Sequence, residues 1–83
     1  MTAEEMFKEL GYEKSEDLQG IKYVLKIETT YEYTNIISFI VDGKIVDFSH
    51  YDSFEDSESG LSINMYELKA VIQQCKEFGW LDD

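Results

Sequence analysis

The sequence contains no arginine and no proline, and cysteine and histidine occur once each. Its 7 basic residues are all lysines and stand against 18 Asp and Glu residues, which gives a formal net charge of −11. Binding sites for nucleic acid need clustered cations opposite the phosphates, and arginine is the usual reader of bases. The composition therefore argues against direct nucleic-acid binding and, for the same reason, against binding to an anionic membrane surface.

The single cysteine, Cys75, cannot form an internal disulfide, so the chain does not depend on an oxidising compartment. The first residues, MTAEEMFKEL, carry acid where a signal peptide has lysine or arginine. No apolar run approaches the roughly 18 residues that a membrane-spanning helix needs. We therefore expect a soluble, cytoplasmic protein.

Motifs of catalysis and metal binding are also missing from the sequence. One histidine and one cysteine cannot build a Cys/His metal cluster, and no glycine-rich phosphate loop, G-x-S-x-G or H-E-x-x-H pattern occurs. Asp56, Glu58 and Glu67 have the spacing of positions 1, 3 and 12 of a calcium loop. Gly60 then falls at position 5, whereas an EF-hand needs glycine at position 6. We expect no enzymatic activity, no metal and no cofactor, and a packing role for His50.

What the sequence does have is apolar and aromatic residues. Hydrophobic residues make up 43% of the chain and aromatics 14%, which is too much for an intrinsically disordered protein despite the high net charge. No proline-rich or glycine/serine-rich break divides the 83 residues. The chain is therefore predicted to fold as one domain, residues 1–83.

Both ends of the chain carry the pattern of an amphipathic helix with a capping box. The first box is formed by Thr2 and Glu5, and the apolar stripe that goes with it is Ala3, Met6, Phe7 and Leu10. The second box is formed by Asn64 and Glu67, and its stripe is Met65, Leu68, Val71, Ile72, Cys75 and Phe78. The echo between KELGY and KEFGW is explained by two helix endings of the Schellman type, with Gly11 and Gly79 in the left-handed position.

Between the helices the apolar period changes to two, which is typical of strands with one buried face. The first strand alternates Ile21, Tyr23, Leu25 and Ile27 with polar residues. The stretch TNIISFIVDGKIVDFSH then predicts a hairpin whose type I′ turn is at Asp42-Gly43. Its register places Phe39 opposite Val46 and Ile37 opposite Phe48 on the core face. The other face carries Ile36, Ile40 and Ile45, and we expect either the second helix or another chain to cover it.

These elements predict an α+β fold: a helix, a three- to four-stranded antiparallel meander and a C-terminal helix packed on the sheet. Two or three of the strands are clear from the alternation. The fourth is assigned to the short edge segment LSI before Asn64.

The strongest candidate for a binding site is a group of aromatic residues near one end of the predicted sheet. Aromatic anchors within a polar rim are typical of protein-binding surfaces. The predicted partner-binding residues are the anchors Tyr31, Tyr33, Tyr51 and Phe54 and the acidic rim Asp52, Glu55, Asp56 and Glu58. The alternative is that these aromatics only close the open end of a small core.

In general style the chain resembles small uncharacterised proteins encoded by phages and prophages of Gram-positive bacteria. The resemblance spans the whole chain and is carried mainly by its ends, MTAEEMFKELGYEK and MYELKAVIQQCKEFGWLDD. It implies the cytoplasm of a bacterial host as the setting. No activity and no catalytic residue comes with it.

The functional hypothesis is a small acidic protein that acts by binding another protein, of the host or of the phage, with its acidic rim steering a basic partner. One alternative is an inhibitor that mimics DNA and occupies the site of a nucleic-acid-binding protein. A further alternative, compatible with the first, is a homodimeric structural or accessory protein that associates through Ile36, Ile40 and Ile45.

Overall fold

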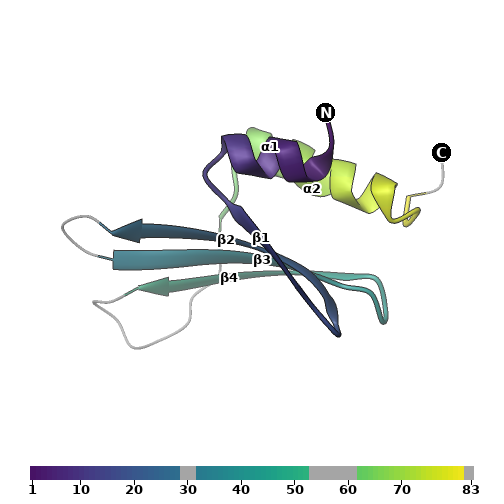
Figure 1. The fold of residues 1–83 in the computed structure, drawn as a ribbon, viewed down its shortest axis with the longest axis horizontal. Helices are drawn as coiled ribbons and strands as arrows, with labels where there is room; N and C mark the ends of the chain where they lie inside the picture. Colours follow the sequence, from purple (N-terminus) through teal and green to yellow (C-terminus); the bar gives the residue numbers. More distant parts are fainter. Residues whose placement is uncertain (29–31, 53–61, 82–83) are drawn as a thin grey trace.

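The computed structural model describes residues 1–28, 32–52 and 62–81. The elements in chain order are α1 (Ala3–Glu9), β1 (Glu13–Asp17), β2 (Gly20–Glu28), β3 (Glu32–Ile40), β4 (Ile45–Asp52) and α2 (Met65–Glu77). The strands form one antiparallel sheet in the order β1-β2-β3-β4 (Figure 1). The predicted α+β fold of helix, meander and helix is confirmed.

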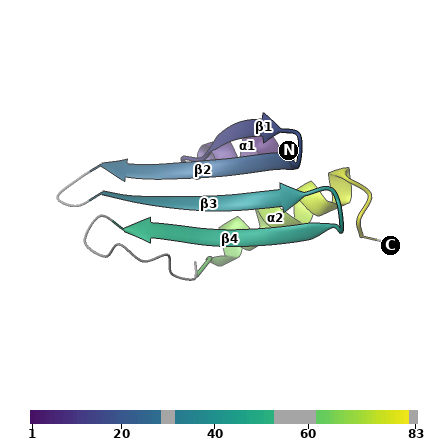
Figure 2. The same cartoon turned by 90° about the horizontal axis from the view of Figure 1, so that it is seen from below.

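Both helices lie on the same side of the sheet (Figures 1 and 2). They pack against each other, and the backbone N–H of Ala3 donates a 2.7 Å hydrogen bond to Oε2 of Glu77 at the far end of α2. The expectation that α2 packs on the sheet is therefore confirmed. Its alternative position, over Ile36, Ile40 and Ile45, is not the one observed, and the second face of the sheet carries neither helix.

The core lies between the helices and the covered face of the sheet. Its largest fully buried side chains are Tyr23, Phe7, Phe39 and Ile37. The rings of Phe7 and Tyr23 stack with centroids 4.0 Å apart, and Phe39 meets Tyr23 edge-on at 5.9 Å. Aromatic pairs of this kind add to the stabilisation that burial alone gives. A few large rings therefore fill most of the core of this short chain.

The buried face of α2 agrees with the predicted stripe at Val71 and Cys75 and differs from it elsewhere. The buried residues are Ala70, Val71, Gln74 and Cys75. Met65, Leu68 and Ile72, which the stripe placed inside, are exposed to 62%, 36% and 39%. A hydrogen bond in the core accounts for this difference. The hydroxyl of Tyr23 donates a 2.5 Å hydrogen bond to Oε1 of Gln74, which brings a glutamine into the core.

The helix termini are as predicted. Thr2 and Asn64 are the N-caps of complete capping boxes. At the end of α1, the N–H of Tyr12 bonds to the carbonyl of Phe7 and that of Gly11 to the carbonyl of Lys8. The end of α2 has the same pair of bonds, and both following glycines have positive φ. The two similar stretches of sequence are thus two Schellman endings.

The register of the β3–β4 hairpin is confirmed, with Ile37 opposite Phe48 and Phe39 opposite Val46. The type of turn is not. Gly43 and Lys44 have positive φ, of 89° and 54°, whereas Asp42 does not, so the turn is not type I′. The strands end at the Ile40–Ile45 pair, which leaves a four-residue loop, and the register is preserved.

The strand β1 was not predicted, and the strand predicted at LSI is wrong for its described residues. Ser62 and Ile63 lie outside any strand, and residue 61 is outside the described part. All five residues of β1 are exposed, so its sequence, EKSED, has no apolar alternation to reveal it. The strand exists because a two-residue turn folds it back on β2, and the Asp17 carboxylate accepts from the N–H groups of Gln19 and Gly20.

Candidate binding surface

The face of the sheet that the helices leave bare is the main candidate for a functional surface, and we call it the open face. It is defined by alternate residues of the three longer strands. They are Gly20, Lys22, Val24 and Lys26 of β2, Thr34, Ile36, Ser38 and Ile40 of β3, and Ile45, Asp47, Ser49 and Tyr51 of β4. In the part of the chain that the structure describes, no helix or strand covers it (Figure 2).

The open face is more apolar than a sheet surface that only faces water. Ile36 and Ile40 lie along β3 in the middle of the face, and Val24 is the neighbour of Ile36 on β2. Ile45 and Tyr51 on β4 are exposed to 51% and 46%. These apolar residues form two groups, Val24 with Ile36 and Ile40 with Ile45, and the polar row of Lys22, Ser38 and Asp47 lies between them. Single apolar residues are common on protein surfaces, whereas several on one face of a sheet make it a candidate binding surface.

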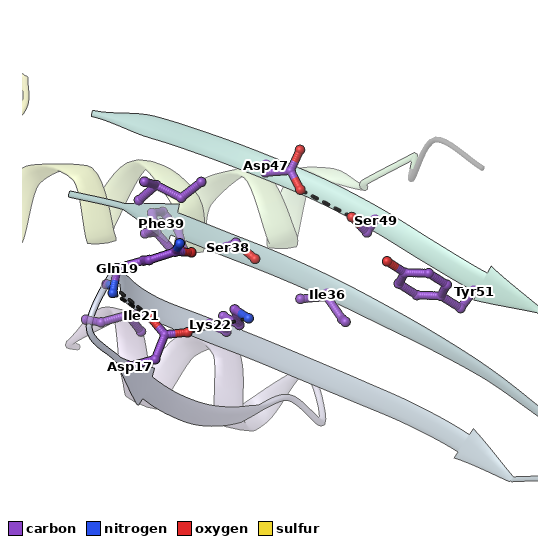
Figure 3. Close-up of a pocket in the computed structure, with 12 residues that line it drawn as sticks. Asp17, Gln19, Ile21, Lys22, Ile36, Ser38, Phe39, Asp47, Ser49 and Tyr51 are labelled. Carbon is purple, nitrogen blue, oxygen red and sulfur yellow. Dashed lines mark hydrogen bonds and ion pairs between the residues drawn. The ribbon is translucent and has the colours of Figure 1, made fainter. Parts of the chain in front are cut away.

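Polar groups of both signs flank this apolar centre. Lys22 and Asp47 belong to one row across the sheet, because each pairs with Ser38 on the central strand (Figure 3). Lys22 Nζ lies 3.4 Å from Oδ2 of Asp17, and the Ser49 hydroxyl donates a 3.2 Å hydrogen bond to Asp47. A shallow hollow of about 240 Å³ lies among these side chains. One row across the open face thus carries a cation on β2 and an anion on β4, with apolar residues in the rows on either side of it.

The pKa of Asp17 is lowered from its usual value, chiefly by the hydrogen bond from the N–H of Gln19 and further by Lys22. The carboxylate therefore remains charged in the turn before β2, where it holds both the turn and the neighbouring lysine. This arrangement gives Lys22 a defined position at the border of the open face.

A second set of polar side chains lies on the covered face, at the end of the sheet where β4 ends. Its members are His50, Asn35, Tyr12 and Glu67. Nδ1 of His50 lies 2.6 Å from Oδ1 of Asn35, so this nitrogen carries the proton when the amide accepts. The side chain of Asn35 also bonds to the hydroxyl of Tyr12, and that hydroxyl donates to Oε2 of Glu67 in the first turn of α2. The Tyr33 ring packs 5.4 Å from the ring of His50.

Burial and the neighbouring Glu67 carboxylate raise the pKa of Tyr12 well above its usual value. Tyr12 is therefore a neutral donor whose role is to join α2 to the sheet. Because the other carboxylate oxygen of Glu67 accepts from the N–H of Asn64, the residue caps the helix and binds the tyrosine at once. The chain of bonds from His50 to Glu67 joins β4 and β3 to the first turn of α2.

The predicted partner-binding residues do not form one described surface. Tyr33 pairs with Asp52 and Thr34 with Tyr51, so Tyr33 and Tyr51 point to opposite faces of the sheet. Tyr33 belongs to the covered face and Tyr51 to the open face. Asp52 ends β4, and its side chain is outside the description. The other five predicted residues lie outside the described residues: Tyr31, Phe54, Glu55, Asp56 and Glu58.

The sequence analysis found the apolar residues of the open face but missed Lys22 and Asp47. The predicted hairpin register already places Asp47 opposite Ser38, whereas the pairing of Lys22 with Ser38 depends on the β2–β3 register, which the sequence analysis did not predict. The predicted site was based on aromatic residues, which are the usual anchors of interfaces, and these lie near one end of the sheet.

Apolar side chains are also exposed on the outside of the helix layer. Met65 and Tyr66 lie in the first turn of α2, and Tyr66 borders a small apolar depression with Met1, Met6 and Leu10. Met1 precedes α1, Met6 lies within it and Leu10 is its C-cap, whereas Tyr66 belongs to α2. The open face differs because its residues are fixed by the ladders on both sides of β3.

Among the residues described, no three His, Cys, Asp or Glu side chains gather to hold a metal ion. No helix within residues 1–28, 32–52 and 62–81 is long and apolar enough to cross a membrane. Comparison of the chain with protein-family models, with curated proteins and with solved structures found no significant match.

Proposed function

We propose that this chain is an interaction protein that binds another protein chain through the open face and catalyses no reaction itself. One observation carries the proposal: both helices pack on the same face of the sheet and leave Ile36, Ile40 and Ile45 on the other. A four-stranded sheet with a single covered face can be stable alone, so the open face, which no helix or strand of the described residues covers, can bind a partner.

The physical reason is the cost of keeping apolar surface in water. Removing such surface from water gains about 25 cal/mol for each Å², and association on a preformed sheet loses little conformational freedom. The residues at the border of the open face are polar, which is the usual arrangement of an interface with an apolar centre and a hydrated rim. Lys22 and Asp47 then select the orientation of the partner.

The setting that fits this role is the cytoplasm, which the single cysteine and the acidic composition support. The resemblance to phage and prophage proteins supports a bacterial host as the cell in which the partner is found. The high net charge of −11 keeps the free chain soluble and limits non-specific association.

The proposal is tested by photo-crosslinking from the open face. A benzophenone amino acid replaces Ile45, which is half exposed at the start of β4, and in a matched control it replaces Lys76, which is exposed on α2. Both proteins are irradiated in a lysate of the cells that encode the chain. We expect a discrete covalent adduct from position 45 and none from position 76, and peptide mass spectrometry then identifies the attached chain.

A second variant shows whether the adduct needs the apolar surface. Adding Ile40→Lys to the protein with the photo-reactive residue at position 45 should remove the adduct, because Ile40 pairs with residue 45 and a lysine there repels an apolar partner. Equal labelling from positions 45 and 76, or an adduct that survives Ile40→Lys, would show that the open face is not the binding surface.

A further inference from the structure

We infer that the open face binds a second copy of this chain, related to the first by a two-fold axis that runs parallel to β3. The inference rests on the proposed function, because it names the occupant of the same surface. It is carried by the positions of Lys22 and Lys26 on β2 and of Asp47 and Tyr51 on β4 in the cross-strand rows of the sheet.

Two sheets can meet face to face about a two-fold axis in two ways. We call the position of a cross-strand row along the strand direction its level. An axis across the strands places β2 over β2 of the second copy and reverses the order of these levels. An axis parallel to the strands keeps the levels and reverses the strand order, so that β2 lies over β4 of the second copy. β3 is the middle one of the three longer strands, and an axis that runs along it puts β3 over β3.

The charges of the open face distinguish these arrangements. With the parallel axis, Lys22 of one copy lies over Asp47 of the other, because both occupy the level of Ser38. Symmetry repeats this pair, so each dimer has two. With the axis across the strands and its centre near Ile36, Lys22 meets Lys26 of the second copy, and four lysines crowd the interface. Electrostatic complementarity therefore selects the parallel axis.

The remaining rows are also complementary about the parallel axis. Lys26 shares a level with Thr34 and Tyr51, so it lies over the Tyr51 ring of the second copy, where a cation–π contact is favourable. Ile36 and Ile40 on the axis strand meet their own counterparts. Residues of β3 thus meet their own counterparts along the axis, and the pairs between β2 and β4 lie on both sides of it.

The distances permit these contacts between copies. Within one chain Ser38 stands between Lys22 and Asp47, which are two strand spacings or about 10 Å apart, and both side chains extend away from the sheet. Packed sheets are also about 10 Å apart, a gap that a lysine and an aspartate extending from opposite sides can close. In the free chain Lys22 contacts Asp17 at 3.4 Å, which keeps its ammonium group at the border of the face.

The size of the surface predicts a weak dimer. The strands β2 to β4 have 8 or 9 residues each, and at about 3.3 Å per residue and about 4.8 Å per strand they cover a flat area of about 400 Å². Stable interfaces bury about 800 Å² on each partner. We therefore expect a dissociation constant in the micromolar range, with both monomer and dimer present at accessible concentrations.

The test is a charge exchange followed by sedimentation equilibrium over about 10 to 500 µM. Lys22→Glu and Asp47→Lys each turn two attractive pairs into two repulsive ones, and we expect each variant alone to dimerise at least tenfold more weakly than the unchanged chain. In an equimolar mixture of the two variants both pairs become attractive again. The mixture should recover the affinity of the unchanged chain as a heterodimer.

The controls carry the same changes of net charge away from the open face. Lys76→Glu on α2 and Glu9→Lys on α1 are at exposed positions, and neither should change the dissociation constant by more than about twofold. Circular dichroism checks that every variant is folded. As a second measurement, Ser38→Cys, on the axis strand, should join two copies through a short bis-maleimide, whereas Ser15→Cys on β1 should not.

Each failure has its own meaning. A monomer at every concentration overturns the inference but leaves the proposed function standing if position 45 still crosslinks to a different protein. A dimer that is indifferent to Lys22→Glu and Asp47→Lys uses another surface, such as the edge of β4, and also overturns it. A mixture that fails to recover affinity rules out the axis parallel to β3. Absence of any adduct from position 45 would remove the proposed function itself.

Discussion

The hydroxyl of Tyr23 on β2 and Oε1 of Gln74 on α2 lie 2.5 Å apart inside the core, and the bond between them sets the rotation of α2. Both residues are almost fully buried. A buried amide needs a partner, because leaving it without one costs about 1 to 3 kcal/mol. The helix therefore turns Gln74 inward at the expense of Leu68 and Ile72.

Replacing Tyr23 by phenylalanine should lower the free energy of unfolding by about 1 to 3 kcal/mol, measured by urea denaturation. The ring and its stacking on Phe7 are kept, so the loss reflects the unpaired Gln74 oxygen. In Tyr23→Phe with Gln74→Leu both polar groups are removed, and the double variant should recover part of the loss. A double variant that loses the sum of the two single effects would contradict this account.

Stability should fall in alkaline solution because of two buried tyrosines. Burial raises the pKa of Tyr23 to about 12 and, together with Glu67, raises that of Tyr12 further. An unfolded tyrosine has a pKa near 10, so the folded state holds these protons more tightly. The resulting stabilisation is complete below about pH 10 and is lost as the pH rises through the folded values.

The measurement is urea unfolding at pH 8, 10 and 11, with tyrosinate absorbance followed in parallel. Tyr23→Phe should reduce the fall in the free energy of unfolding between pH 10 and 11. Tyr66→Phe, at a position 69% exposed, should leave that fall unchanged. If all six tyrosines of the chain titrate together near pH 10, the hydroxyls of Tyr12 and Tyr23 are not buried as described.

The sequence predicts features that depend on neighbouring residues better than features that depend on contacts between distant residues. Capping boxes, Schellman endings and the β3–β4 register follow from residues close in sequence, and they were predicted correctly. The strand β1 has five exposed residues and depends on pairing with β2, so no local apolar pattern announces it. The rotation of α2 depends on a bond between residues 51 positions apart, which periodicity does not contain.

The same distinction applies to the candidate surface. The apolar half of the open face follows from alternation in β3 and β4, and the sequence analysis identified it. Tyr33 and Tyr51 are both near one end of the sheet, as predicted, but the register that brings them there also places them on opposite faces. A one-residue difference in register decides the face of a side chain, so proximity along a hairpin does not by itself define a surface.

Gly20 and Gly79 should differ sharply in their tolerance of alanine. Gly20 begins β2 with φ of 152°, and a Cβ added there would overlap the backbone carbonyl of Phe39. Gly79 has φ of 75° and an added Cβ meets nothing within 4 Å. We expect Gly79→Ala to cost about 1 kcal/mol from the left-handed conformation alone, and Gly20→Ala to cost more than about 2 kcal/mol because the β2–β3 ladder must shift.

Thermal and urea unfolding of the two alanine variants give the comparison. Equal losses would mean that the ladder near Phe39 yields at little cost. The amide N–H of Val41, which bonds to the carbonyl of Gln19 at 2.9 Å, reports on the same place. Its hydrogen exchange should accelerate in Gly20→Ala and remain unchanged in Gly79→Ala.

Ile36 and Ile37 are neighbours on β3 that face opposite sides of the sheet, so the same substitution should have opposite consequences. Ile37 is fully buried beneath the helices, and Ile37→Lys places a charge in the core, which should unfold the chain or cost more than about 4 kcal/mol. Ile36 lies on the open face, and at low protein concentration Ile36→Lys should cost about 1 kcal/mol or less.

The effect of Ile36→Lys should then depend on protein concentration, because the side chain is on the surface that we assign to a partner. At about 5 µM the unchanged chain and Ile36→Lys should unfold at similar urea concentrations. At several hundred µM the unchanged chain gains stability from association, and the variant does not. A large loss at low concentration would mean that Ile36 already packs against part of its own chain, and the open face would then be no surface for a partner.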